Sequence, residues 1–427
     1  MNLRGFLKNR IVKNAGWLIG GRIVHMILAF FVGLLTARYL GPGNYGLINY
    51  AASFTSFFAS VCTLGINSII IKDFVDHPEE EGTAVGTAIV LRLISSFLSF
   101  LMVAGIVLVV DRNEPVTVLV VILCGLGMIF QVFDTINYWF QAMLQSKFTS
   151  IATTVAYIVV SGYKIFLLAT EKSVAWFAIS TSIDYVVIAA FLLWIYKKQN
   201  GPRMAFSWKK AKQLLSSGQH FILAGLMVSI YGGVDKFMLK HMLDETAVGY
   251  YATALAVCNM WVFVLSAIID SMYPAILQAY QDDPRAFDVK NRRLYAMVFY
   301  VSTVVSLVFV VFGDLIIRIL YGKAYAPAAA PLKIITWYTA FSYLGVARNA
   351  WMVCHNCQKY LKYLYIGAAV LNVILNACLI PAWGEIGAAA ASLITQVSTI
   401  FVFPVMIREL RPNVKLMLEG IVFRKMK

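Results

Sequence analysis

The sequence predicts an all-α protein that crosses a lipid bilayer about twelve times. Hydrophobic residues make up 60% of the chain and charged residues 13%, and the mean hydropathy is +0.75. A soluble domain is nearer to about half apolar and a quarter charged, so lipid must cover the excess. Long apolar runs such as Leu98–Val110 indicate helices rather than the alternating strands of a membrane barrel.

The candidate spans are marked by their length and by the polar residues between them. The N-terminal half contains Gly16–Ala37, Gly46–Ile71, Ala84–Val110, Val116–Trp139, Phe148–Ala169 and Ser173–Tyr196. The C-terminal half contains Leu214–Leu239, Ala247–Leu277, Leu294–Leu320, Ala328–Val353, Leu361–Ile380 and Glu385–Ile407. The basic residues at the start precede an apolar run that is too long for a signal peptide, so we expect it to stay as the first span.

Loop charges predict the orientation in the membrane, because lysine and arginine accumulate in cytoplasmic loops. The segment Lys197–Lys212 and the residues from Arg408 onward are the most basic, so both termini are expected on the cytoplasmic side. The acidic loop Asp76–Glu81 is discordant, but acidic residues have little effect on topology. We therefore expect a multi-pass protein of a bacterial or archaeal cytoplasmic membrane.

The basic loop also predicts the domain organisation. Residues 1–200 form an N-lobe, 201–212 a basic cytoplasmic linker, 213–410 a C-lobe and 411–427 a basic cytoplasmic tail. Similar small-residue segments, Tyr45–Ala52 and Val248–Ala254, open the second and eighth spans. An even number of spans in each half gives both halves the same orientation, related by an axis along the membrane normal.

Several function classes are excluded or disfavoured. The net charge of +15 is explained by cytoplasmic loops, so no nucleic-acid partner is expected. The cysteines are scattered, and Cys354 and Cys357 have no second ligand pair nearby, so no metal is predicted. The sequence has no phosphate-binding loop, catalytic triad or large extramembrane domain. We expect no catalytic residues, no cofactor and no enzymatic activity.

Charges inside the spans are the main functional signal, because each costs about 2.5–3.5 kcal/mol at the bilayer centre. The cations are Arg22, Arg92, Lys164, Lys236, Lys333 and Arg348, with Arg318 nearer an edge, and the acids are Asp134, Asp184, Asp235 and Asp270. Any single cation can snorkel or form a structural ion pair. The surplus of cations predicts a cationic cavity that receives an anion, and the best candidates are Arg22, Lys236 and Arg348, followed by Arg92.

Other residues predict motion or ion coupling. Gly20-Gly21 and Gly232-Gly233 either loosen their helices or allow close packing, and Pro274 is expected to kink its span. Asp235 and Asp270 are candidates for proton or sodium coupling. His25 can titrate in such a cycle, although a satisfied interior histidine is the alternative.

Four stretches together resemble a known family. They are Thr36–Gly46, Val234–Leu239 with Val248–Tyr251, Leu320–Tyr325 with Ala328-Ala329, and Ile380–Ala389. In this order they are similar to the Wzx-like polysaccharide flippases, which belong to the multidrug/oligosaccharidyl-lipid/polysaccharide exporter superfamily. Physically these segments are helix ends and close-packing surfaces, so they indicate the fold more strongly than the ligand.

The resemblance implies two six-helix lobes around a central cavity that opens alternately to each side of the membrane. It also implies a polyprenyl-pyrophosphate-linked oligosaccharide of the O-antigen, capsule or exopolysaccharide type as cargo. The chain is expected to act as a monomer among membrane lipids, with glycan polymerase or assembly proteins as further partners. Alternatives are a multidrug exporter of the same superfamily, which needs an acidic cavity, and a lipid-II-type flippase, for which about fourteen spans are expected. A membrane glycan polymerase or ligase is disfavoured because no large external loop is present.

Overall fold

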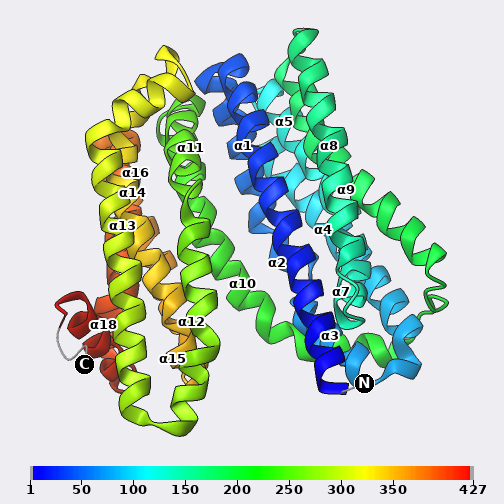
Figure 1. Ribbon diagram of the computed structural model, residues 1–427. Helices are drawn as coiled ribbons and strands as arrows, with labels where there is room; N and C mark the ends of the chain where they lie inside the picture. Colours follow the sequence, from blue (N-terminus) through cyan, green and yellow to red (C-terminus); the bar gives the residue numbers. More distant parts are fainter. Residues whose placement is uncertain (1–2, 424–427) are drawn as a thin grey trace. The chain divides into compact units, whose positions relative to one another are not determined.

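The computed structural model describes the backbone of residues 3–423 and the side chains of residues 25–423 except 27, 68, 220, 223 and 224. Within these limits the chain is helical and contains no strand. Its internal contacts divide it into two units (Figure 1). Unit 1 comprises the chain up to Leu40 together with Leu47–Gly233, and unit 2 comprises Gly41–Gly46 and the chain from Val234 on.

The predicted membrane class agrees with this architecture. Seven helical segments in the described part are long and apolar enough to cross a bilayer: Pro78–Val110, Pro115–Ala142, Lys147–Ala169, Val174–Lys198, Val262–Asp282, Pro284–Leu320 and Gln358–Met406. The protein is therefore an all-α, multi-pass membrane protein. The count of twelve spans stays a prediction, since several expected spans are interrupted.

Unit 1 contains the following elements. They are α1 (Leu3–Phe57), α2 (Ala59–Cys62), α3 (Asn67–Asp76), η1 (Pro78–Glu80), α4 (Glu81–Val110), α5 (Pro115–Gly125), α6 (Gly127–Phe130), η2 (Gln131–Phe133), α7 (Asp134–Ala142), α8 (Lys147–Ala169), α9 (Val174–Lys198) and most of α10 (Trp208–Met242). A buried cluster that includes Phe74, Phe140 and Leu192 forms its core around α3, α7 and α9.

Unit 2 begins within α10. It contains α11 (Glu245–Asn259), α12 (Val262–Asp282), α13 (Pro284–Leu320), η3 (Lys323–Ala328), α14 (Ala329–Ala347), α15 (Asn349–Cys354), η4 (Gln358–Tyr360), α16 (Leu361–Val397), the π-helical turn η5 (Ser398–Val402), α17 (Phe403–Met406), η6 (Arg408–Leu410) and α18 (Arg411–Ile421). A second buried cluster, with Tyr295, Trp351 and Met417 among its members, joins α13, α15 and α18.

Two helices are longer than the expected spans because each joins two helices across a glycine. Gly41 divides α1 with φ 70° and ψ 171°, and Gly384 divides α16 with φ 58° and ψ −136°. Only glycine adopts such angles readily. Both glycines lie in the family-like stretches, where they turn the chain from one helix into the next.

Other expected spans are interrupted, in both units. The predicted second span, Gly46–Ile71, contains the break between α2 and α3, and the predicted eighth, Ala247–Leu277, is divided between α11 and α12. The fourth span is split into α5, α6, η2 and α7, and the tenth into α14 and α15. Average hydropathy did not reveal these breaks, because each segment stays apolar overall although single polar residues such as Gln131 and Arg348 lie at the breaks.

The close approach of two glycine-bearing segments explains part of the family-like pattern. Gly41–Gly46 belongs to unit 2 by its contacts, and it packs against the start of α11. A Cβ on Gly46 would lie 1.7 Å from the Glu245 carbonyl oxygen, and a Cβ on Gly249 would lie 2.0 Å from the Pro42 carbonyl oxygen. These two positions therefore need glycine so that the backbones can touch.

Candidate functional site

A buried polar cluster surrounds Asp235 in unit 2. The Asp235 side chain lies on α10 and is 7% exposed. Its Oδ2 accepts hydrogen bonds from the Tyr251 hydroxyl at 2.5 Å and from Ser392 Oγ at 2.6 Å. Its Oδ1 accepts a hydrogen bond from Asn376 Nδ2 at 2.6 Å. Donors from α11 and from both halves of α16 thus converge on one carboxylate.

The same cluster contains further oxygen atoms. Asn376 Nδ2 also donates to Asn372 Oδ1 at 3.0 Å, and both asparagines are fully buried. Asn376 Oδ1 and Asn372 Nδ2 have no hydrogen-bond partner within the described part of the chain. Buried polar atoms are nearly always satisfied by protein, water or an ion. Carboxylate, amide and hydroxyl oxygens at this density suit a proton or a hard cation.

Lys236 follows Asp235 directly but does not pair with it. Successive helical residues point about 100° apart, and the Asp235 carboxylate is already bound by its neutral donors. The Lys236 side chain is partly exposed. It forms no hydrogen bond or ion pair with any residue that the structure describes. Lys236 is therefore a cation in a predicted span that is attracted by the neighbouring Asp235 but forms no ion pair within the described part of the chain.

Arg348 is buried at the junction of α14 and α15. It is 4% exposed, and its Nη1 donates to the Thr399 carbonyl at 3.1 Å. That carbonyl lies in the π-helical turn η5, where the regular helical hydrogen-bond pattern is altered. Arg348 has no carboxylate partner among the described residues, and its Nε is unsatisfied there.

Arg92 has a similar environment in unit 1. It is 2% exposed and donates to Thr135 Oγ1 at 2.9 Å and to the Gln131 carbonyl at 3.4 Å. Its guanidinium carbon lies 5.8 Å from the centre of the Tyr138 ring. Gln131 starts η2, which interrupts the fourth predicted span. Each of these arginines thus binds a carbonyl in a segment where the α-helix is broken.

The remaining predicted site residues do not join these clusters. The side chains of Gly20, Gly21 and Arg22 lie outside the described residues. His25 is exposed rather than interior and packs against Tyr157 with ring centres 4.1 Å apart. Asp270 and Pro274 are exposed on α12. Of the other predicted in-span cations, Lys333 binds Asp314 at 2.5 Å.

The two adjacent glycines of α10, Gly232 and Gly233, differ in how closely other residues pack against them. A Cβ on Gly232 would meet no atom within 4 Å, whereas a Cβ on Gly233 would lie 2.8 Å from the Phe57 ring. The boundary between the units falls between Gly233 and Val234. Close packing therefore explains Gly233 but not Gly232.

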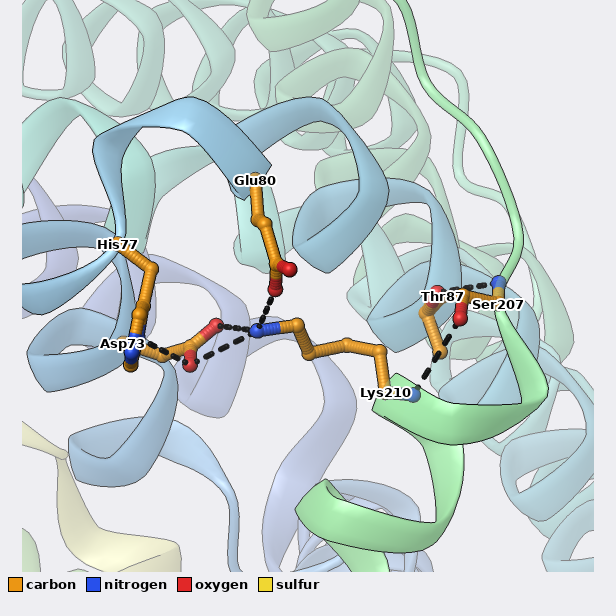
Figure 2. Close-up of polar contacts among 6 residues, drawn as sticks. All are labelled: Asp73, His77, Glu80, Thr87, Ser207 and Lys210. Atoms are coloured by element: carbon orange, nitrogen blue, oxygen red, sulfur yellow. Dashed lines mark hydrogen bonds and ion pairs between the residues drawn. The ribbon is translucent and has the colours of Figure 1, made fainter.

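A second polar cluster, missed by the sequence analysis, holds the start of α10 in unit 1 (Figure 2). Lys210 is 4% exposed and lies 2.6 Å from Glu80 Oε2 and 3.1 Å from Asp73. The segment before it is also fixed, since Ser207 N donates to Thr87 Oγ1 at 3.0 Å. The predicted linker is thus bound to α3, η1 and α4 within one unit.

A family model described as polysaccharide biosynthesis protein matches residues 11–280. A capsular polysaccharide biosynthesis protein, CapF, from Staphylococcus aureus is 20% identical, over 90% of this chain and 96% of that protein. A putative O-antigen transporter from Escherichia coli K12 is also 20% identical, over 86% of this chain and 90% of that protein.

Among solved structures, the lipid II flippase MurJ in an inward closed conformation has a similar fold. Its TM-score is 0.73 at 15% sequence identity, over 96% of this chain and 90% of that chain. At this identity the likeness concerns the fold alone. The membrane fold implied by the family-like stretches is thereby confirmed.

Proposed function

The chain belongs to the polysaccharide biosynthesis protein family, and from this premise we propose that it is a flippase for lipid-linked oligosaccharides. It carries polyprenyl-pyrophosphate-linked repeat units of the O-antigen, capsule or exopolysaccharide type from the cytoplasmic to the outer leaflet by alternating access. The names of the S. aureus and E. coli relatives support this cargo class. The likeness in fold to a lipid flippase is consistent with a transport cycle that includes no chemical step.

The observation that carries the proposal is that Lys236 forms no hydrogen bond or ion pair with the residues that the structure describes. A lysine inside a membrane costs about 2.5–3.5 kcal/mol unless water or a counter-ion accompanies it. Its neighbour Asp235 attracts it electrostatically, but the Asp235 oxygens are hydrogen-bonded to neutral donors and no described acid forms an ion pair with the lysine. A pyrophosphate headgroup supplies a direct anionic partner, and the lysine in turn lowers the cost of moving that headgroup through a low-dielectric region.

The arginines have a different part in this proposal. Arg92 and Arg348 each bind a carbonyl in an interrupted helix, so they hold the broken segments together. Their unsatisfied Nε groups add positive potential without direct contact with the cargo. Arg22 remains a proposed headgroup ligand on the sequence argument alone.

We propose that Asp235 couples transport to a cation. The oxygens of Asp235, Asn372 and Asn376 form a ligand set for a sodium ion, and the carboxylate alone can accept a proton. The membrane potential already favours outward movement of an anion by about 2.3 kcal/mol per charge per 100 mV. Ion exchange at Asp235 then resets the cycle after release. Asp270 and His25 are both exposed.

We also propose where the chain bends during the cycle. The linker is bound within unit 1 by Lys210, so it moves with that unit. The helix α10 continues into unit 2. The boundary between the units falls just after Gly233, next to Gly232, where an added Cβ would meet no atom within 4 Å. A hinge at Gly232 therefore allows each unit to move as a body.

The distribution of basic loops supports a cytoplasmic membrane with both termini on the cytoplasmic side. We propose that the chain acts there as a monomer and delivers its cargo to glycan polymerase or assembly proteins.

Reconstituted transport tests the proposed function. Full-length protein in liposomes is given a short-chain polyprenyl-pyrophosphate oligosaccharide, and its appearance in the opposite leaflet is followed by a lectin that cannot enter. Transport is expected for the protein and to fall at least about 10-fold for Lys236→Glu, because like charges repel the headgroup. Lys198→Glu, an exposed cation on α9, is the matched control. Equal transport by Lys236→Glu, or transport of cationic drugs instead, contradicts the proposal.

A further inference from the structure

The residues after the last predicted span form a folded element with a distinct outer surface. α18 is fixed on α13 by its buried side: Asn413 Nδ2 donates to the Tyr295 hydroxyl at 2.7 Å, and Arg292 Nε donates to Glu419 Oε2 at 2.8 Å. A Cβ on Gly420 would lie 2.6 Å from the Arg292 carbonyl oxygen. The helix is therefore a rigid part of unit 2.

The opposite side of α18 combines charge with apolar surface. Arg411, Lys415, Leu418 and Val422 follow the i, i+4, i+7, i+11 pattern that places residues on one helix face. All four are exposed, Leu418 by 48% and Val422 by 72%. The cations lie at the N-terminal end of the face and the apolar residues at its C-terminal end.

This face borders a groove of about 440 Å³, which we call the α18 groove. Val405 of α17 forms its other side, and Val414 and Glu419 complete the lining. Arg411 Nε donates to the Val405 carbonyl at 2.8 Å, so the guanidinium is held at the groove. The groove thus has an apolar floor with an arginine fixed at one end.

The α18 groove carries two cations that form no ion pair within the described part of the chain. Arg411 and Lys415 have no ion pair among the residues that the structure covers. Glu419, the acid in the lining, is bound by Arg292. Two cations beside an apolar groove attract a ligand that is both anionic and apolar.

The place of α18 in the chain, shortly after the last apolar segment, indicates that the helix lies near the membrane surface. The last apolar segment ends at Met406, and Arg411 follows five residues later. By length and composition, α18 therefore begins just beyond a candidate span, which is where lipid headgroups are expected. Val405 and Met406, at the end of that segment, are exposed by 48% and 75%, so exposed apolar side chains lie shortly before the start of α18.

We propose that the α18 groove binds an anionic phospholipid of the surrounding leaflet. The phosphate lies between Arg411 and Lys415, and an acyl chain follows Leu418, Val422 and Val405. A soluble anion makes no use of the apolar surface, and a zwitterionic lipid gains less from the two cations. This binding site is independent of the transport proposed above.

Native mass spectrometry of the full-length protein in detergent tests the site. The protein is titrated with phosphatidylglycerol or phosphatidylcholine of the same chain length. We expect tighter binding of the first phosphatidylglycerol, and we expect Arg411→Gln with Lys415→Gln to reduce that preference by about 10- to 30-fold. Lys359→Gln with Lys362→Gln, two exposed cations elsewhere in unit 2, is the matched control. The melting temperature of each variant shows that it is folded.

A second pair of substitutions tests the apolar part. Leu418→Ser with Val422→Ser is expected to weaken binding of long-chain phosphatidylglycerol at least about 5-fold while binding of a short-chain analogue changes little. An unchanged lipid preference in the Arg411/Lys415 double variant overturns the proposal. Binding of glycerol phosphate as tight as that of phosphatidylglycerol also overturns it, because the apolar groove then contributes nothing to binding. If that variant keeps its lipid but loses an acidic co-purifying protein, the surface belongs to a protein partner and the lipid site is wrong.

Discussion

The ammonium of Lys210 lies 3.1 Å from both carboxylate oxygens of Asp73, although 137 residues separate them in the sequence. Glu80 is the second acid on the same ammonium. Burial lowers the pKa of Lys210, but the hydrogen bonds to Glu80 and Asp73 outweigh it and raise the pKa above its usual value. A raised lysine pKa means that, while the two acids are ionised, the contribution of Lys210 is fully present below about 10.4, the unfolded pKa, and is lost as the pH rises through the folded pKa.

Loss of this charge is expected to destabilise unit 1. Lys210→Met leaves the buried Asp73 with the exposed His77 as its remaining ion-pair partner among the described residues, and His77 is charged only when protonated. Removing one partner of a buried pair costs about 3–5 kcal/mol, or less here because Glu80 is half exposed. Thermal unfolding in detergent measures the change. Lys209→Met is the control, since Lys209 is exposed. Equal melting temperatures for both variants would show that the ion pairs contribute nothing.

The same pair shows what sequence reasoning could and could not find. Charge counting used the basic segment Lys197–Lys212 as a topology signal and left the acidic loop Asp76–Glu81 as a discordant feature. In the structure the two segments meet, so the acids counter a lysine. Hydropathy is a local property of the sequence, and it predicted the membrane helices. A contact across 137 residues is a tertiary property with no local signal.

For the candidate site, the sequence indicated the charged residues but not the uncharged groups that surround them. In-span charges identified Asp235, Lys236, Arg92 and Arg348 because each is costly in a membrane. The partners of Asp235 were not identified, since Asn372, Asn376 and Ser392 are uncharged and ordinary within a helix. The carbonyls that the arginines bind were hidden as well, because average hydropathy does not reveal where a helix breaks.

Replacement of Asp235 is expected to separate ion coupling from folding. Asp235→Asn keeps the shape but places an amide donor against the donors of Tyr251, Ser392 or Asn376, at a cost of about 1–3 kcal/mol. Transport in liposomes should then lose its response to an imposed proton or sodium gradient. Asp270→Asn, an exposed acid on α12, should keep that response. A normal gradient response in Asp235→Asn excludes Asp235 as the coupling residue.

The glycines of the family-like stretches are expected to differ in tolerance. A Cβ at Gly249 overlaps the Pro42 carbonyl at 2.0 Å, and neither backbone can move cheaply, so Gly249→Ala should lower the melting temperature and the yield. Gly43→Ala, in the same contact region, meets its nearest atom at 3.6 Å and should be neutral. Equal stability of the two variants, measured by fluorescence-detected unfolding, contradicts the close-approach explanation.

The final prediction concerns the bend in α10. Gly232→Ala introduces no clash and strengthens the helix by about 1 kcal/mol, so it should keep or raise stability. If α10 bends there during transport, the bent state becomes less populated, and transport should fall about 5-fold while cargo binding is retained. Gly162→Ala on α8 is the matched control, since a Cβ there also meets nothing within 4 Å and the helix lies wholly in unit 1. Stability and transport measured on the same preparations distinguish the outcomes. Full transport by a stabilised Gly232→Ala protein means that α10 moves as a straight helix and that the units change orientation elsewhere.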